Sequence, residues 1–256
     1  MHHATNGGKP VRYLILSDLH SNWEALEAVL KDAHGLYDEI ICLGDVAGYG
    51  PDPNRVIEWV RNNVTTVIRG NHDRASAGLD DLEWFNPIAR AATVWTISQL
   101  TPENASYLAS LPQGPVIYKG FLLVHGSPLD EDEYLVSITD ARNVFQYLET
   151  NVAFFGHTHL QGIFAWVDGR YDVIRRPEPF ESNIHTTLDP DGAYLINPGS
   201  VGQPRDTDAR AAYAIFDIGK RQVTLRRTPY DAETTRSKIE KAGLPDILGS
   251  RLVIGR

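Results

Sequence analysis

Seven side chains that commonly bind divalent metals follow short apolar stretches, at the points where predicted strands end. Three of these stretches are residues 11–17, 39–43 and 66–69. Because ligands bind at the carboxyl ends of strands in open α/β sheets, we expect these side chains to converge. They are Asp18, His20, Asp45, Asn71, His125, His157 and His159.

The donor set combines carboxylate, amide and imidazole groups and contains no thiolate. Such a set suits Mn, Fe, Zn, Co or Ni and excludes a thiolate-rich structural zinc site. The pair His157 and His159 could arise by chance, and Asn71-His72-Asp73 could be only a turn, since Asn and Asp favour turns. Chance does not account for all seven groups at strand ends in one chain.

Seven ligands are enough for two metal ions, which need a bridging carboxylate between them. Asp45 is the best candidate for the bridge, because spacing ties Asp18 to His20. Two divalent ions carry four positive charges, and the two carboxylates carry two negative charges. The net charge of +2 would attract a phosphate and lower the pKa of a bound water. His72 is not needed as a ligand and can act as an acid or as a charge stabiliser.

The elements that position these groups alternate between strand and helix in the first half of the chain. Ser21 and Glu24 form an S-x-x-E capping box, which predicts a helix start. A further helix is expected over residues 140–150. Asp231 should cap a last helix that Gly243 ends.

Residues 74–113 carry no strand signal, and two helices are expected there, over 87–100 and 102–111. We expect this segment to lie over one rim of the site. Its aromatic residues favour core packing, with a lid that stacks on a substrate ring as the alternative; they are Trp84, Phe85 and Trp95.

The second half of the chain reads as hairpins, one of them around Asp168-Gly169. Together the two halves predict a mixed sheet with helices outside and a second, more antiparallel sheet packed on it. We expect one domain over residues 1–256, with a mostly helical insertion at about 74–113.

Composition limits the partners of the chain. The formal net charge is −9 over 256 residues, which argues against stable nucleic-acid binding and a DNA nuclease. No apolar run approaches the roughly 20 residues of a membrane span, and residues 1–10 lack the apolar centre of a signal peptide. The single Cys42 is compatible with the cytoplasm. We expect a small phosphorylated substrate and no membrane partner, and a homo-oligomer remains open.

Five motifs occur in an order that resembles the calcineurin-like metallophosphoesterases. They are Asp18-Leu19-His20, Gly44-Asp45, Gly70-Asn71-His72-Asp73, His125-Gly126 and Gly156-His157-Thr158-His159. The stretch Asn197-Pro198-Gly199-Ser200 is similar to the bacterial and archaeal phosphodiesterase branch of that superfamily.

The resemblance implies an α/β fold, a four-layer α-β-β-α sandwich with two mixed sheets. It implies two divalent ions as cofactors, with Mn²⁺ as the first choice. It places His72 beside the leaving-group oxygen. It assigns one ion to Asp18, His20, Asp45 and His159, and the other to Asp45, Asn71, His125 and His157.

The chain departs from the family in one motif. Protein Ser/Thr phosphatases carry G-D-x-V-D-R-G, whereas residues 44–50 read Gly-Asp-Val-Ala-Gly-Tyr-Gly. The phosphate-binding Arg and the Asp that orients the catalytic His are therefore missing. Arg74 or Arg205 could replace that Arg, although each could equally be a solvated surface residue.

These observations predict a dinuclear phosphoesterase that hydrolyses small phosphodiesters or nucleotides by attack of a metal-bound hydroxide. A phosphomonoesterase or phosphatase of the same fold is the first alternative. A catalytically silent protein-binding scaffold is the second, and the complete ligand set weighs against it.

Overall fold

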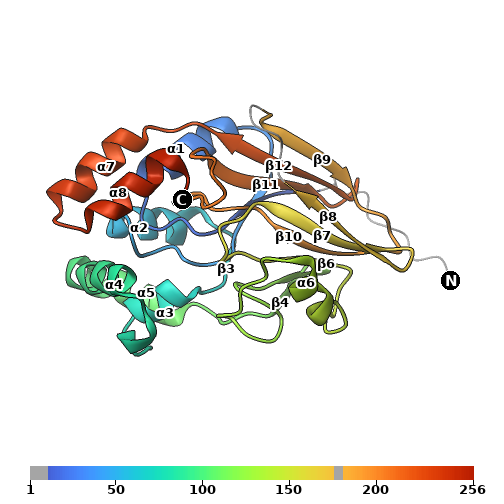
Figure 1. The fold of residues 1–256 in the computed structure, drawn as a ribbon, viewed down its shortest axis with the longest axis horizontal. Coiled ribbons are helices and arrows are strands. Elements are labelled where there is room, and N and C mark those ends of the chain that lie inside the picture. The colour runs from blue at the N-terminus through green and yellow to red at the C-terminus, as the bar shows by residue number, and fades with distance from the viewer. Residues whose placement is uncertain (1–10, 176–180) are drawn as a thin grey trace.

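Two six-stranded sheets form the centre of the computed structural model, which describes residues 11–175 and 181–256 (Figure 1). The first sheet has the order β3 (Thr66–Val67), β2 (Glu39–Cys42), β1 (Arg12–Leu16), β11 (Ala211–Asp217), β12 (Gln222–Thr228) and β9 (Asn183–Thr187). The second sheet has the order β4 (Val116–Tyr118), β5 (Phe121–Leu123), β6 (Val152–Phe154), β10 (Ala193–Asn197), β7 (Gly162–Val167) and β8 (Arg170–Arg175).

Both sheets are mixed, as predicted. Strands β1, β2 and β3 run parallel in the first sheet, and β5, β6 and β10 run parallel in the second. The remaining pairings are antiparallel. Each sheet therefore has a group of three parallel strands whose carboxyl ends lie at one edge, where ligands bind in such sheets.

Helices cover the outer faces of the two sheets, which gives the four layers (Figure 1). The first sheet is covered by α1 (Trp23–Asp32) and α2 (Pro53–Asn63), and the second by α6 (Ile138–Phe145). The other helices are α3 (Asn71–Ser76), α4 (Pro87–Gln99), α5 (Pro102–Ser110), α7 (Ala232–Lys241) and α8 (Asp246–Ile254).

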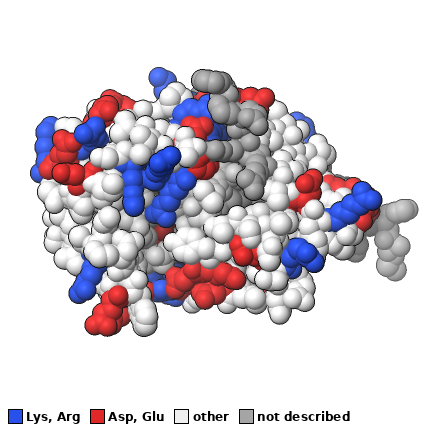
Figure 2. Space-filling model, viewed as in Figure 1, with Lys and Arg blue, Asp and Glu red and all other residues white. Residues whose placement is uncertain are grey.

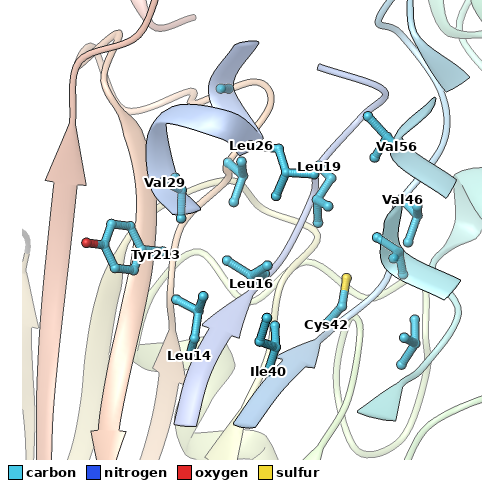
Figure 3. Close-up of a cluster of buried hydrophobic side chains, with 14 of the residues drawn as sticks. Leu14, Leu16, Leu19, Leu26, Val29, Ile40, Cys42, Val46, Val56 and Tyr213 are labelled. Carbon is cyan, nitrogen blue, oxygen red and sulfur yellow. The ribbon is translucent and has the colours of Figure 1, made fainter. Parts of the chain in front are cut away.

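Strand β1 shows why the layers form. Its side chains alternate between the two faces of the sheet. Leu14 and Leu16 pack against α1 and α2 (Figure 3), whereas Tyr13 and Ile15 lie between the two sheets. All four are at most 2% exposed. A strand covered on both faces reads as a continuous apolar run, and this is how residues 11–17 read.

Helix α1 does not start at the predicted capping box. Its N-cap is Asn22, whose side chain accepts from the backbone N–H of Ala25. Ser21 has a φ of 52° and donates its backbone N–H to Val46, so it still belongs to the loop that holds His20. The capping box was wrong because Ser21 serves this loop rather than the helix.

Two further helix predictions need correction. Helix α6 covers Ile138–Phe145 rather than 140–150, because Ser137 and Asp140 form a capping box. Helix α7 is not the last, since α8 follows and packs against it. Gly249 in α8 lowers helix propensity, but a Cβ there would lie 2.8 Å from Cγ of Arg236 in α7. Gly249 therefore weakens the sequence signal for α8 and also permits its close packing against α7.

Residues 74–113, all of which are described, contain no strand, as predicted. They form the 3₁₀ turn η1 (Leu82–Trp84), α4 and α5, and Thr101 caps α5. Phe85 packs its ring edge-on against His72 at 5.2 Å, so the segment does reach the site. The core-packing expectation is wrong for Trp84, which is 90% exposed at the end of η1.

No helix in the described ranges 11–175 and 181–256 is long and apolar enough to cross a membrane.

Candidate metal centre

The carboxyl-end loops of both sheets bring two overlapping groups of donors together. Within each group, ligand atoms lie within 4.8 Å of one another, and every member is buried. Asp45 belongs to both groups, as expected of a bridging carboxylate. The groups are Asp18, His20, Asp45 and His159, and Asp45, His125 and His157.

Asp45 lies between the two groups. Its Oδ2 is 3.5 Å from Nε2 of His20 and 3.5 Å from Nε2 of His125. The seventh predicted ligand, Asn71, places its amide oxygen 3.3 Å from the same His125 nitrogen. Donors bound at about 2.0–2.2 Å to one ion are separated by roughly these distances. The structure therefore brings all seven predicted ligands to one place.

Backbone carbonyls fix the tautomers of three imidazoles. A carbonyl oxygen only accepts, so Nδ1 of each ring carries the proton and Nε2 keeps its lone pair. Such outer hydrogen bonds are typical of metal-binding histidines. The pairs are His20 with Ala47 (3.1 Å), His125 with Leu43 (2.8 Å) and His159 with Gln203 (2.6 Å).

His157 has the opposite arrangement. Its Nε2 lies 3.2 Å from the backbone oxygen of Asp132, so Nε2 carries the proton and Nδ1 keeps the lone pair. We therefore expect His157 to bind through Nδ1 and the other three histidines through Nε2.

The donor chemistry fits a cation. The Nε2 atoms of His20 and His159 are 3.0 Å apart, and both carry lone pairs in the tautomers just derived. Two lone pairs that face each other need a positive centre between them. Oδ2 of Asp18 is also buried and has no hydrogen-bond partner among the described residues. Buried carboxylates are normally paired or bind metal, so these residues fit the implied ions.

Charge interactions within the centre are strong. Burial opposes ionisation of Asp45, but His125, His72 and His20 together hold its pKa well below the ordinary value. Burial disfavours the charged form of His125, but Asp45 outweighs it and raises the pKa to about 10, so a metal ion that binds at Nε2 would displace the proton there. The pKa of His157 falls to about 3, first because of burial and then because of the charge on His125. The Asp45 carboxylate thus keeps its negative charge inside the protein.

The ligand loops have unusual backbone conformations. Non-glycine residues rarely adopt a positive φ, and such strain gathers at functional sites. Backbone hydrogen bonds maintain it, among them Asp18 N–H to Gly44 at 3.0 Å and His20 N–H to Asp45 at 2.9 Å. The positive values are 53° at Asp18, 44° at His20, 53° at Asp45, 64° at His157 and 59° at His159.

The Gly-Asn-His-Asp motif begins with glycine because the backbone of Gly70 lies very close to Asp45. A Cβ at this position would stand 2.1 Å from Oδ1 of Asp45. That same oxygen accepts from the backbone N–H of His72 at 2.9 Å. The glycine therefore permits the close approach of loop 70–73 to the bridging carboxylate.

His72 lies beside the ligands without being part of either group. Its ring centroid is 5.0 Å from that of His20 and 4.4 Å from that of Tyr49. Burial lowers its pKa to about 4, so the ring is neutral at pH 7. Its Nδ1 is buried and has no hydrogen-bond partner among the described residues. An imidazole nitrogen without a partner beside the predicted ligands is suited to act on a substrate.

The two predicted arginines lie in different surroundings. The Arg74 guanidinium contacts Glu131 and lies 2.6 Å from Asp80 and 2.9 Å from Asp132. This acidic cluster holds it in place. Arg205 instead donates to Gln203 at 2.9 Å and lies 5.6 Å from the centre of the Tyr49 ring. Arg205 is thus the arginine that the structure brings towards the centre.

Two tyrosines at the centre were not predicted. The Tyr49 ring lies 4.7 Å from His20, and the Tyr134 ring lies 4.0 Å from His157. Burial raises the pKa of both hydroxyls, while Arg205 opposes the rise. Tyr49 could have been found, because it stands where the phosphatase motif has its arginine. Tyr134 lies in a loop without a motif.

Known proteins place this centre in a family. Residues 11–221 match the calcineurin-like phosphoesterase superfamily domain, and the chain belongs to that superfamily. An uncharacterized protein of Methanocaldococcus jannaschii is 36% identical over 247 residues, which are 94% of this chain and 97% of the relative.

Solved structures agree with this assignment. A metallophosphoesterase from Sphaerobacter thermophilus is 39% identical, with a TM-score of 0.83 over 97% of this chain and all of the other. A hypothetical protein from Pyrococcus horikoshii shares the fold, with a TM-score of 0.79 at 21% identity over 96% of this chain and 99% of the other. The predicted family and fold are confirmed.

Proposed function

We propose that this chain is a metal-dependent phosphoric ester hydrolase with a dinuclear centre, acting on small phosphodiesters or nucleotides. The observation that carries the proposal is the position of Asp45, whose Oδ2 is equidistant from His20 and His125 at 3.5 Å. A carboxylate between two donor groups suits two ions at the separation that phosphoester hydrolysis uses.

The chain's residues divide between the two ions. Bound there, two divalent cations would supply a water of lowered pKa and positive charge for the phosphate oxygens. Mn²⁺ is our first choice, with Fe, Zn, Co and Ni as alternatives of similar ligand preference. The first set is Asp18, His20, Asp45 and His159, and the second is Asp45, Asn71, His125 and His157.

His72 and Arg205 act on the substrate in this proposal. His72 stands beside His20 without being needed as a ligand, and we assign it to the leaving-group oxygen. Its neutral ring can donate one hydrogen bond to that oxygen. Arg205 pairs with a non-bridging phosphate oxygen, which replaces the arginine missing from residues 44–50. Arg74 is assigned no such role, since three carboxylates already hold it.

Charge favours small substrates over DNA. On the face shown in Figure 2, basic side chains lie in small groups beside acidic ones and form no continuous basic surface, and the net charge is −9. Duplex binding depends on neutralising many phosphates with Lys and Arg. We therefore propose a small phosphorylated substrate and, given the single Cys42, a cytoplasmic location.

The test is a substrate panel on metal-depleted protein reloaded with each candidate metal. The panel contains nucleoside phosphodiesters, bis(4-nitrophenyl) phosphate and 4-nitrophenyl phosphate, with Asp45→Asn as the matched control. We expect diesters to be hydrolysed with Mn²⁺ and the activity to disappear with a chelator or in the control. Faster hydrolysis of the monoester would make the chain a phosphomonoesterase, and no hydrolysis with any metal would favour a scaffold.

A further inference from the structure

A cavity of about 480 Å³ is lined by segments that directly follow residues of the metal centre in the chain. Three of its lining residues each follow directly in sequence a residue at the centre. Consecutive Cα atoms are about 3.8 Å apart, so at three places the backbone of the lining is within one residue of the backbone of the site. The pairs are Tyr134–Leu135, His159–Leu160 and Arg205–Asp206.

The lining is largely apolar. Phe155 and Phe164 lie in it with their rings stacked at 6.2 Å, and aliphatic side chains extend the surface. The aliphatic residues are Leu135, Ile138, Ile163 and Val173. A volume of this size lies within the range of about 300–1,000 Å³ that is usual for small-molecule sites.

Gln161 in the lining is already committed to the protein. Its Nε2 donates to the carbonyl oxygens of Pro198, Tyr213 and Arg226, and its Oε1 accepts from Arg227. An amide has two N–H donors and one oxygen, so this side chain keeps little capacity for a ligand.

Asn197 is committed in the same way. It donates to Gly156 and Thr158 and accepts from the N–H of Gly199. The other polar side chains of the lining are also engaged within the protein: Ser137 donates to Asp140, Thr207 donates to the carbonyl of Asp206, and Asp206 pairs with Arg227. A ligand in the cavity would therefore be held mainly by apolar contact. Apolar contact favours hydrocarbon over a sugar, whose hydroxyls would lose their bonds to water.

We propose that this cavity binds an uncharged alkyl or aryl substituent that stays on phosphorus during hydrolysis of a phosphodiester. This inference rests on the proposed function. The leaving group is assigned to His72, whose aromatic neighbours Tyr49 and Phe85 do not line the cavity. The phosphate would lie between His72 and the cavity, beside Arg205, which directly precedes Asp206 of the lining.

The test compares methyl 4-nitrophenyl phosphate with phenyl 4-nitrophenyl phosphate, which lose the same leaving group and differ only in the substituent. Val173→Trp fills the cavity from the edge strand β8. Val116→Trp is the matched control, because Val116 is also partly buried but lies on β4, the opposite edge of the same sheet.

We expect wild type to prefer the phenyl ester in kcat/KM. A single methylene in an apolar pocket is worth about 10–200-fold, so Val173→Trp should lower the phenyl-to-methyl ratio at least tenfold. The control should leave the ratio unchanged. Val136→Glu is a second variant that should fold readily, because Val136 lines the cavity and is 54% exposed. Its charge should also lower the ratio.

A binding measurement on metal-free protein separates this inference from the proposed function. The probe is 1-anilinonaphthalene-8-sulfonate, followed by fluorescence, and we expect weaker binding in Val173→Trp and Val136→Glu but not in the control. An unchanged ester ratio in both folded cavity variants would overturn the proposal, and so would unchanged probe binding. If wild type hydrolyses neither ester with any metal, the proposed function fails and with it the substituent's role, while the probe still reports whether the cavity binds apolar groups.

Discussion

Gly48 lies so close to His72 that a Cβ on Gly48 would stand 2.6 Å from Nδ1 of the imidazole. Gly48 also has a φ of 92°, which side chains rarely adopt. This is the position at which the phosphatase motif carries the Asp that orients its histidine. The ring of His72 takes that space here, and Tyr49 and Phe85 pack against it.

The first prediction concerns this contact. Gly48→Ala should displace His72 and lower kcat on a nucleoside phosphodiester, because misplaced catalytic groups cost about 10²-fold. Metal content, measured by elemental analysis, should stay at the wild-type level. Gly78→Ala is the control, because Gly78 also has a positive φ but nothing lies within 4 Å of its Cβ position. A fully active Gly48→Ala would contradict the role of this contact.

The second prediction concerns metal content. Wild type should bind about two divalent ions per chain after loading with Mn²⁺, as a bridged pair requires. Asp45→Asn should lose both, whereas His20→Ala should mainly lose one. Elemental analysis measures the number of ions per chain in the three proteins. One ion or none in wild type, or full metal content in Asp45→Asn, would rule out the bridge.

The third prediction concerns His72. A hydrogen bond from the neutral His72 ring to the departing oxygen is worth roughly 10²–10³ in rate, as for other preorganised donors, and matters most for a basic leaving group such as a sugar alkoxide. His72→Ala should therefore lose much more activity on a nucleoside phosphodiester than on a nitrophenyl ester, at equal metal content. Equal losses on both substrates would mean that His72 stabilises charge or positions the phosphate instead.

The fourth prediction contrasts the two arginines. Arg205→Ala should raise KM for the substrate, because charge-assisted hydrogen bonds to phosphate are lost. Arg74→Ala should mainly lower stability, since its guanidinium contacts Glu131, Asp80 and Asp132. Steady-state kinetics and urea unfolding on both variants measure the two effects. The reverse pattern would assign phosphate binding to Arg74.

The fifth prediction concerns pH. Burial opposes ionisation of Glu131, but hydrogen bonds from Arg69 and Arg74 outweigh it and lower its pKa. A lowered folded pKa stabilises the fold above the unfolded value of about 4.3, and this stabilisation is lost as pH falls through the folded pKa. Glu131→Gln should therefore cost about 1–3 kcal/mol at pH 7, as loss of hydrogen bonds to charged groups does.

Urea unfolding of wild type and Glu131→Gln at pH 7, 5, 4 and 3 tests this dependence. The difference should shrink towards acid, because Glu131 of wild type becomes protonated as well. Glu83→Gln is the control, since that side chain is exposed. A difference that stays constant down to pH 3 would show that the charge of Glu131 is not responsible.

The clustering of the candidate ligands could be predicted because strand signals and chemistry coincide at the same positions. Asp18, Asp45 and His125 each follow an apolar run, and an apolar run marks a buried strand. The tautomers could not be predicted, since Ala47, Leu43 and Gln203 contribute only backbone oxygens. Every residue has a backbone carbonyl, so the residue type does not show which carbonyl accepts from a histidine. The positive φ angles of the ligand loops are hidden for the same reason.

The errors in the prediction also have physical causes. Ser21 has a residue type that often caps helices, but its positive φ places it in the loop after His20. Asn22 is therefore the N-cap of α1. Helix α8 contains Gly249, which lowers the helix propensity of the segment but allows α8 to pack closely against Arg236 of α7. Tyr134 reaches His157 from a loop, and loop positions depend on the whole fold. Local sequence patterns do not predict these features, because each depends on contacts with residues far away in the chain.

The division of ligands between the two sheets has a thermodynamic consequence. The first donor group joins Asp18 and Asp45, after strands of the first sheet, to His159, after a strand of the second. The other group likewise joins Asp45 to His125 and His157. Each ion would thus be a cross-link between the halves of the sandwich, and its binding free energy would add to that of folding. The melting temperature of this chain should therefore follow the concentration of free metal around it.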